Sequence, residues 1–209
     1  MLKSWLRSAL LAGLALPMAV AAGPKEDYEA GRKSYAQGDF AGAMVPLRNA
    51  ADANYAPAQS LLAYILDGAG EDTEAVKYYK MAAEQGDTEG EYGLARQLAS
   101  GEGIAPDPKQ AYEWMSRAAA KGHKSAISAM ADAYIYGGLG LDAAARSDNA
   151  AALKWIEAAA GLDYLPAMMA MANGYKKGAY GLAPDPVKAK VWDDKVKAVS
   201  APPKPAQKK

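Results

Sequence analysis

Small and bulky apolar residues recur along the chain in a pattern that repeats every 32 to 41 residues. Each unit starts with an alanine, has a bulky residue three positions later in most copies, and another small residue seven positions later. Offsets of 0, 3 and 7 lie on one face of an α-helix, so we expect helices whose small residues admit a neighbouring helix around one aromatic anchor. The units are Ala43, Pro46 and Ala50; Ala75, Tyr78 and Ala82; Ala111, Trp114 and Ala118; Ala152, Trp155 and Ala159; and Ala189, Trp192 and Val196.

A second helix is predicted after each of the first four of these helices. Eleven positions after the first alanine stand residues that tolerate a left-handed backbone, which predicts a helix C-cap there: Asn54, Gly86, Gly122 and Asp163. The segments that follow carry apolar or small residues at offsets 0, 4, 5 and 8, which form one helical stripe. These stripes are Ala58, Leu62, Ala63 and Leu66; Gly90, Leu94, Ala95 and Leu98; Ala126, Met130, Ala131 and Tyr134; and Ala167, Met171, Ala172 and Tyr175.

Glycine and proline mark the ends of these elements. The second helices are expected to end at Gly68, Gly101, Gly137 and Gly178. In the phrases "DPKQA" and "DPVKA", Asp107 and Asp185 stand where N-caps are expected, each followed by a proline at the first helical position.

Two helices per repeat with this period predict an all-α solenoid, in which stacking supplies the core that no single repeat could bury. We expect about five helix-turn-helix pairs. Residues 23–57 form a degenerate first repeat that lacks the aromatic anchor, because Pro46 stands in its place. Residues 58–199 form the regular array.

Several phrases resemble the Sel-one-like repeat (SLR) family, a relative of the tetratricopeptide repeat: "AVKYYKMAAEQGD", "QAYEWMSRAAAKGH" and "ALKWIEAAAGLDY" in the first helices, and "GEYGLARQLASGEGIAPD" in a second helix and its loop. The resemblance implies right-handed superhelical stacking and a role as scaffold or adaptor. Exported members of the family are often tied to envelope assemblies, polysaccharide secretion or host interaction. Some secreted members carry a disulfide in each repeat, which this chain cannot form because it has no cysteine.

The first 22 residues are typical of a secretory signal peptide. Lys3 and Arg7 precede an uncharged apolar stretch, and small residues near residue 22 fit a cleavage site. The stretch of about 15 residues is short for a membrane span, which needs roughly 20. An uncleaved anchor is the alternative. We therefore expect a periplasmic or secreted protein with no integral membrane span after cleavage.

The charge balance gives no reason to expect nucleic acid as a partner. The chain has 24 basic and 24 acidic residues, and removal of residues 1–22 leaves 22 and 24, a formal charge of −2. No global basic field is present to attract a polyanion. The last residues, 200–209, are rich in proline and lysine, and we expect them to be disordered or extended.

Residues able to carry out chemistry are sparse. The single histidine, His123, has no second histidine or cysteine to complete a metal or nucleophile site, and we expect it in an exposed loop. Adjacent carboxylates point apart on a helix, as at Asp193 and Asp194. The sequence thus predicts no metal, no cofactor and no enzymatic activity. A carboxylate-based hydrolase acting on cell wall or polysaccharide remains the alternative, since two carboxylates brought together by the fold would suffice.

The second helices supply the candidate binding residues. If they line the concave side, offsets 2 and 6 lie opposite the packing stripe and form a groove. Tyrosine and arginine are common binding anchors, although an ordinary solvated face is the other interpretation. The candidate groove residues are Tyr64, Tyr92, Arg96, Asp132, Met169 and Asn173, with Ser60 and Ser128 at equivalent positions.

The sequence therefore predicts an exported, non-enzymatic scaffold that binds a protein or peptide of the cell envelope in a concave groove. Self-assembly through terminal repeats is a further alternative. Residues 137–149 lengthen the fourth unit, either as a tolerated surface loop or as a contact specific to one partner.

Overall fold

The computed structural model describes residues 23–201. The predicted signal peptide and residues 202–209 of the predicted tail lie outside this range. The helices are α1 (Pro24–Ala36), α2 (Phe40–Asp52), α3 (Ala56–Gly68), α4 (Asp72–Glu84), α5 (Thr88–Ser100), α6 (Pro108–Ala120), α7 (Lys124–Ile135), α8 (Ala143–Arg146), α9 (Asn149–Ala160), α10 (Leu165–Lys177), the 3₁₀ turn η1 (Ala179–Gly181) and α11 (Pro186–Ser200).

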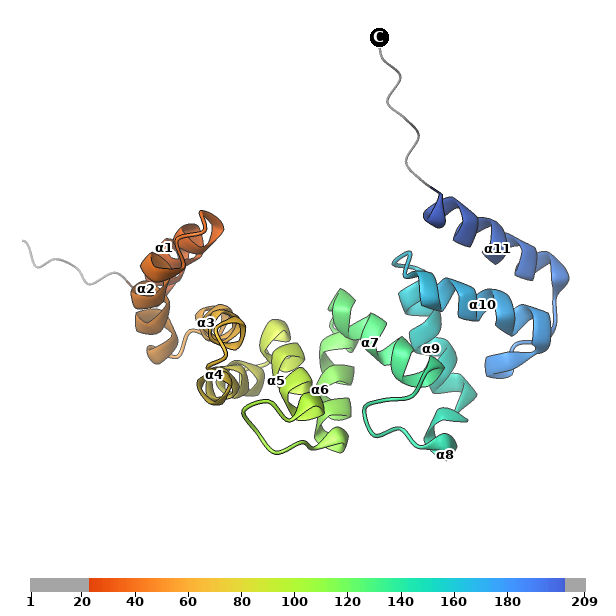
Figure 1. Cartoon of the computed structure of the whole chain (residues 1–209), viewed down its shortest axis with the longest axis horizontal. Coiled ribbons are helices and arrows are strands. Elements are labelled where there is room, and N and C mark those ends of the chain that lie inside the picture. Colours follow the sequence, from red (N-terminus) through yellow and green to blue (C-terminus); the bar gives the residue numbers. More distant parts are fainter. Residues whose placement is uncertain (1–22, 202–209) are drawn as a thin grey trace, which may run out of the picture.

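The long helices pack as five consecutive pairs: α1 with α2, α3 with α4, α5 with α6, α7 with α9, and α10 with α11. Each pair also contacts the next, and the pairs follow one another along an arc (Figure 1). The predicted all-α solenoid is confirmed. Within residues 23–201, none of the helices combines the length and apolar character that a bilayer span requires.

The predicted caps lie where the sequence placed them. All four residues of the C-cap position have positive φ, including the two that are not glycine, Asn54 at 63° and Asp163 at 58°. The side chain of Asp107 accepts a hydrogen bond from the backbone of Gln110, and Asp185 caps α11 in the same way. The helix ends agree with the predicted glycines at Gly68, Gly101 and Gly178, whereas α7 ends at Ile135, two residues before Gly137.

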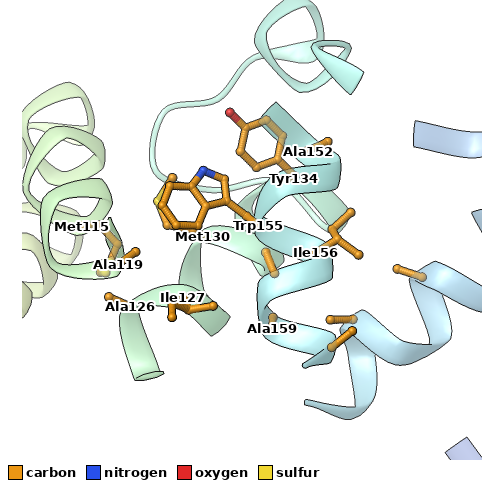
Figure 2. Packing of buried hydrophobic residues seen from close by; sticks show 14 of the residues in the cluster. Met115, Ala119, Ala126, Ile127, Met130, Tyr134, Ala152, Trp155, Ile156 and Ala159 are labelled. Atoms are coloured by element: carbon orange, nitrogen blue, oxygen red, sulfur yellow. The ribbon is translucent and has the colours of Figure 1, made fainter. Parts of the chain in front are cut away.

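The repeated small and aromatic residues form the core. All five alanines that open the units are buried. Tyr78 and Trp155 are 2% and 6% exposed, and Figure 2 shows the Trp155 ring beside Met130. The two other anchors, Trp114 and Trp192, are only half-buried, and the guanidinium of Arg117 lies over Trp114. The predicted burial of the aromatic anchors is therefore confirmed for Tyr78 and Trp155 and only partly met at Trp114 and Trp192.

The insertion after α7 is folded back onto the array. Gly138 and Leu141 form an isolated β-bridge, and α8 follows. Leu139 packs against both halves of the core, and a side chain on Gly140 would lie 2.8 Å from Pro108 at the start of α6. The segment thus contributes packing between repeats, which a freely tolerated surface loop would not. At the other end, Ser200 closes α11 instead of starting the tail.

Candidate functional site

One concavity of the described residues runs across α1, α3 and α5, each of which is the first helix of its observed pair; the repeat pattern had placed α3 and α5 second in their units. It has a volume of about 590 Å³ and reaches the start of α7. We call it the tyrosine groove. A second hollow of about 610 Å³ continues from it along α3 and shares Tyr35, Tyr64 and Arg96. The tyrosine groove is lined by Tyr28, Arg32, Tyr35, Pro57, Ser60, Leu61, Tyr64, Tyr79, Asp87, Glu89, Tyr92, Gly93, Arg96, His123 and Ser125.

Aromatic rings are held along the groove by one another. Tyr35 of α1 meets Tyr64 of α3 edge-on, with ring centroids 6.3 Å apart, and Phe40 lies 5.6 Å from Tyr35 on the other side. Tyr64 and Phe40 are each 56% exposed, which is high for side chains of this size. Exposed aromatic clusters of this kind mark interaction sites. The rings of Tyr35, Tyr64 and Phe40 are therefore held in place by contacts with one another.

The floor of the groove depends on a close approach between α4 and α5. Tyr79 of α4 lies flat against Gly93 of α5, where a β-carbon would come within 2.2 Å of the ring. Burial raises the pKa of the Tyr79 phenol above its usual value. Its hydroxyl therefore stays protonated at physiological pH and can donate a hydrogen bond at the base of the groove.

The polar groups of the groove are partly engaged with one another. Asp87 caps α5 by accepting from the amide of Gly90, and the hydroxyl of Ser60 donates to the same carboxylate. Arg32 donates two hydrogen bonds to Glu29. Arg96 has a looser contact, 3.4 Å from Asp67, whose other oxygen accepts from Gln97.

His123 belongs to this site, and its prediction as an exposed loop residue was wrong. Its side chain is 10% exposed and stacks on Tyr92, with ring centroids 4.3 Å apart. Nδ1 accepts a hydrogen bond from the amide of Ala126 and so caps α7, and Nε2 lies 3.3 Å from Glu89. The neutral imidazole with its proton on Nε2 satisfies both contacts. A histidine was not expected as an N-cap because serine, threonine, aspartate and asparagine dominate that position.

The structure divides the predicted groove residues into two groups. Tyr64, Tyr92 and Arg96 lie together in the tyrosine groove, with Ser60 beside them. The other three predicted residues, Asp132, Met169 and Asn173, do not line it. Asp132 instead accepts a 2.6 Å hydrogen bond from Tyr164, while Met169 is 55% exposed and Asn173 is exposed on α10. Tyr28 and Tyr35 of α1 were not predicted, because the repeat pattern was read from Ala43 in α2 onward and α1 lies before it.

The groove offers little to acid–base or metal chemistry. Its two carboxylates differ in setting, since Asp87 is bound as a helix cap and Glu89 is 72% exposed beside His123. Among the described residues, no three histidine, aspartate or glutamate side chains are grouped so as to hold a metal ion.

Four consecutive segments of the chain match the family model of the Sel1 repeat: residues 56–87, 88–123, 124–164 and 165–192. Together they span more than half of the chain. Each matched segment begins with the first helix of an observed pair (α3, α5, α7 or α10) and continues into the second helix of that pair. The matches begin at α3 and leave out the degenerate pair α1–α2. No curated protein matches the chain.

Solved structures with the same fold include a Sel1 repeat protein from Oxalobacter formigenes, at 27% identity and a TM-score of 0.62, covering 87% of this chain and 74% of that one. Another is c5321, a protective antigen present in uropathogenic Escherichia coli strains, which displays an SLR fold. It is 23% identical with a TM-score of 0.53, and the match covers 85% of this chain and 46% of c5321. A putative sel1 repeat protein from Klebsiella pneumoniae subsp. pneumoniae is 21% identical with a TM-score of 0.56. The match covers 86% of this chain and 88% of that one.

Proposed function

The chain belongs to the Sel1 repeat family, and from this premise we propose that it is an exported scaffold that holds an extended segment of a partner protein in the tyrosine groove. Sel1 repeat proteins generally mediate protein–protein interaction. The sequence of residues 1–22 supports export, and the cell envelope supplies the partner. Binding, and not catalysis, is the activity.

The observation that carries this proposal is the passage of one groove across three successive repeats. A single extended ligand can contact Tyr28 or Tyr35 of α1, Tyr64 of α3 and Tyr92 of α5 at once. Tyrosine and arginine are over-represented among residues that dominate binding energy. Because the helices are rigid, little ordering entropy is lost when the ligand binds.

Site-specific photo-crosslinking in living cells tests the proposal. A photoreactive phenylalanine analogue at Tyr64, an exposed residue of the groove, should give a discrete adduct with a partner protein. The same group at Lys80, an exposed residue of α4 outside the groove, serves as the matched control and should give none. Arg96→Ala should weaken the adduct from position 64. Equal adducts from both positions, or none from position 64, would refute the groove as the binding site.

A further inference from the structure

Charge is unevenly distributed along the chain. Residues 24–100, which include α1, α3 and α5, carry 7 basic and 13 acidic residues, a formal charge of −6. Residues 101–185 are nearly balanced, with 8 basic and 9 acidic. Residues 186–209 carry 7 basic and 2 acidic residues, a charge of +5. The two ends of the protein are therefore electrostatically complementary, which favours association of one end with the other.

The basic end also carries a ligand of the kind that aromatic grooves recognise. Residues 202–209 read "PPKPAQKK", in which Pro202 and Pro205 are spaced as in a PxxP motif. Such segments favour the polyproline II helix and dock on grooves lined with aromatic rings, because little entropy is lost on binding. The chain leaves α11 in this conformation, since Ala201 has φ −68° and ψ 137°.

The dimensions of the groove and the segment agree. A polyproline II helix advances about 9 Å for each three-residue turn, and packed helices lie about 8–10 Å apart. One turn of the segment thus matches one step from α1 to α3 or from α3 to α5. The eight residues span about 25 Å, enough to cross three helices.

We propose that the tyrosine groove of one copy binds residues 202–209 of a second copy, which would link the molecules head to tail. The inference rests on the proposed function of the groove and names its occupant. Prolines would lie between Tyr28, Tyr35, Tyr64 and Tyr92. Lysines would face Asp87 and Glu89, the carboxylates that line the groove, whereas its two arginines, Arg32 and Arg96, each already contact a carboxylate, of Glu29 and Asp67.

The position of the chain end favours a second copy over the same molecule. The segment starts beyond α11, at the opposite end of the arc from α1 and α3 (Figure 1). The near edge of the groove is at the start of α7. Only α10 lies between α11 and α7, so the path to this edge crosses two helix spacings, about 16–20 Å. The segment would use most of its length to reach the near edge of its own groove, and the rest could not extend across α5 and α3 to α1.

Two measurements test the inference. A labelled peptide with the sequence of residues 200–209 is titrated into the chain ending at Ala201, which keeps every described residue. The peptide should bind, more weakly as salt is raised, and Tyr64→Ala should weaken binding at least about tenfold. Tyr136→Ala, at an exposed tyrosine outside the groove, is the matched control and should change nothing. A peptide with its three prolines replaced by alanine keeps the charge and should bind about tenfold less tightly.

Sedimentation velocity over a concentration series gives the second measurement. The full chain, secreted by its expression host, should grow in mass with concentration, and the chain ending at Ala201 should stay a monomer. Equal self-association of both would assign assembly to the terminal repeats and overturn the inference. So would a monomeric full chain, or a peptide that does not bind. Groove crosslinks to other proteins that persist without peptide binding would leave the proposed function standing.

Discussion

Gly93 shows how one residue shapes the tyrosine groove. The glycine lets the ring of Tyr79 lie against the backbone of α5, and this contact sets the depth of the floor. In the sequence, Gly93 looks like a weak point in a helix, because glycine lowers helix propensity. The structure shows that the close approach of two helices requires it.

Gly93→Ala should destabilise the protein by about 1–3 kcal/mol, because the added β-carbon would overlap the ring of Tyr79. Gly68→Ala is the matched control: its β-carbon meets nothing within 4 Å, so it should be neutral or stabilise by up to about 1 kcal/mol. Urea unfolding followed by circular dichroism measures both. If both variants had the same midpoint, the close approach would not be what requires Gly93.

His123 marks the limit of prediction from single residues. The sequence correctly showed that it lacks partners for metal binding or nucleophilic catalysis, but its burial depends on Tyr92, 31 positions earlier. That contact arises only when consecutive repeats stack. A periodic alignment compares equivalent positions in each repeat and does not show which side chains meet across the interface.

At the scale of elements, side-chain hydrogen bonds join each repeat to the next. Tyr78 donates to Asp52, 2.9 Å away, and Tyr164 donates to Asp132, 2.6 Å away. The hydrogen bond to Asp132 raises the pKa of Tyr164 to about 12. The second oxygen of Asp132 is buried without a partner, so loss of Tyr164 would leave this carboxylate poorly satisfied.

Tyr164→Phe should therefore lower stability by about 1 kcal/mol at pH 8. The folded-state pKa of Tyr164 lies above the value of about 10 expected in the unfolded chain, so its contribution is complete below pH 10 and is lost as the pH rises from 10 to 12. The difference from the wild type should shrink over that range. Urea midpoints from pH 8 to 11.5 measure it, with Tyr136→Phe as the exposed control. A constant difference would contradict this account.

The helices and their caps could be predicted from the sequence because each depends on residues that are close together along the chain. Alanine spacing, the left-handed cap at Asn54 and the Asp-Pro starts of helices depend on neighbours within about ten residues. The groove was only half predicted. Tyr92 and Arg96 were found from their offsets, whereas Tyr28 and Tyr35 sit in a pair whose pattern is degenerate.

At the scale of the whole molecule, the core divides into two clusters. One is built around α2, α3 and α4, the other around α7, α9 and α10, and both contact Trp114 and Leu139. Repeat proteins are stabilised by contacts between neighbours, so their parts can unfold separately. The tyrosine groove lies mostly on the first cluster.

Trp155→Ala tests this division. Removing the ring should cost about 3–5 kcal/mol in the second cluster, and amide hydrogen exchange should accelerate in α7, α9 and α10. Helices α1 to α4 should keep their protection, because none of their contacts passes through Trp155. Leu62→Ala, in the first cluster, should give the opposite pattern and disturb the groove. If either variant accelerated exchange along the whole array, the array would unfold as a single cooperative unit and the division would be wrong. The groove could then not stay folded while the second cluster opens.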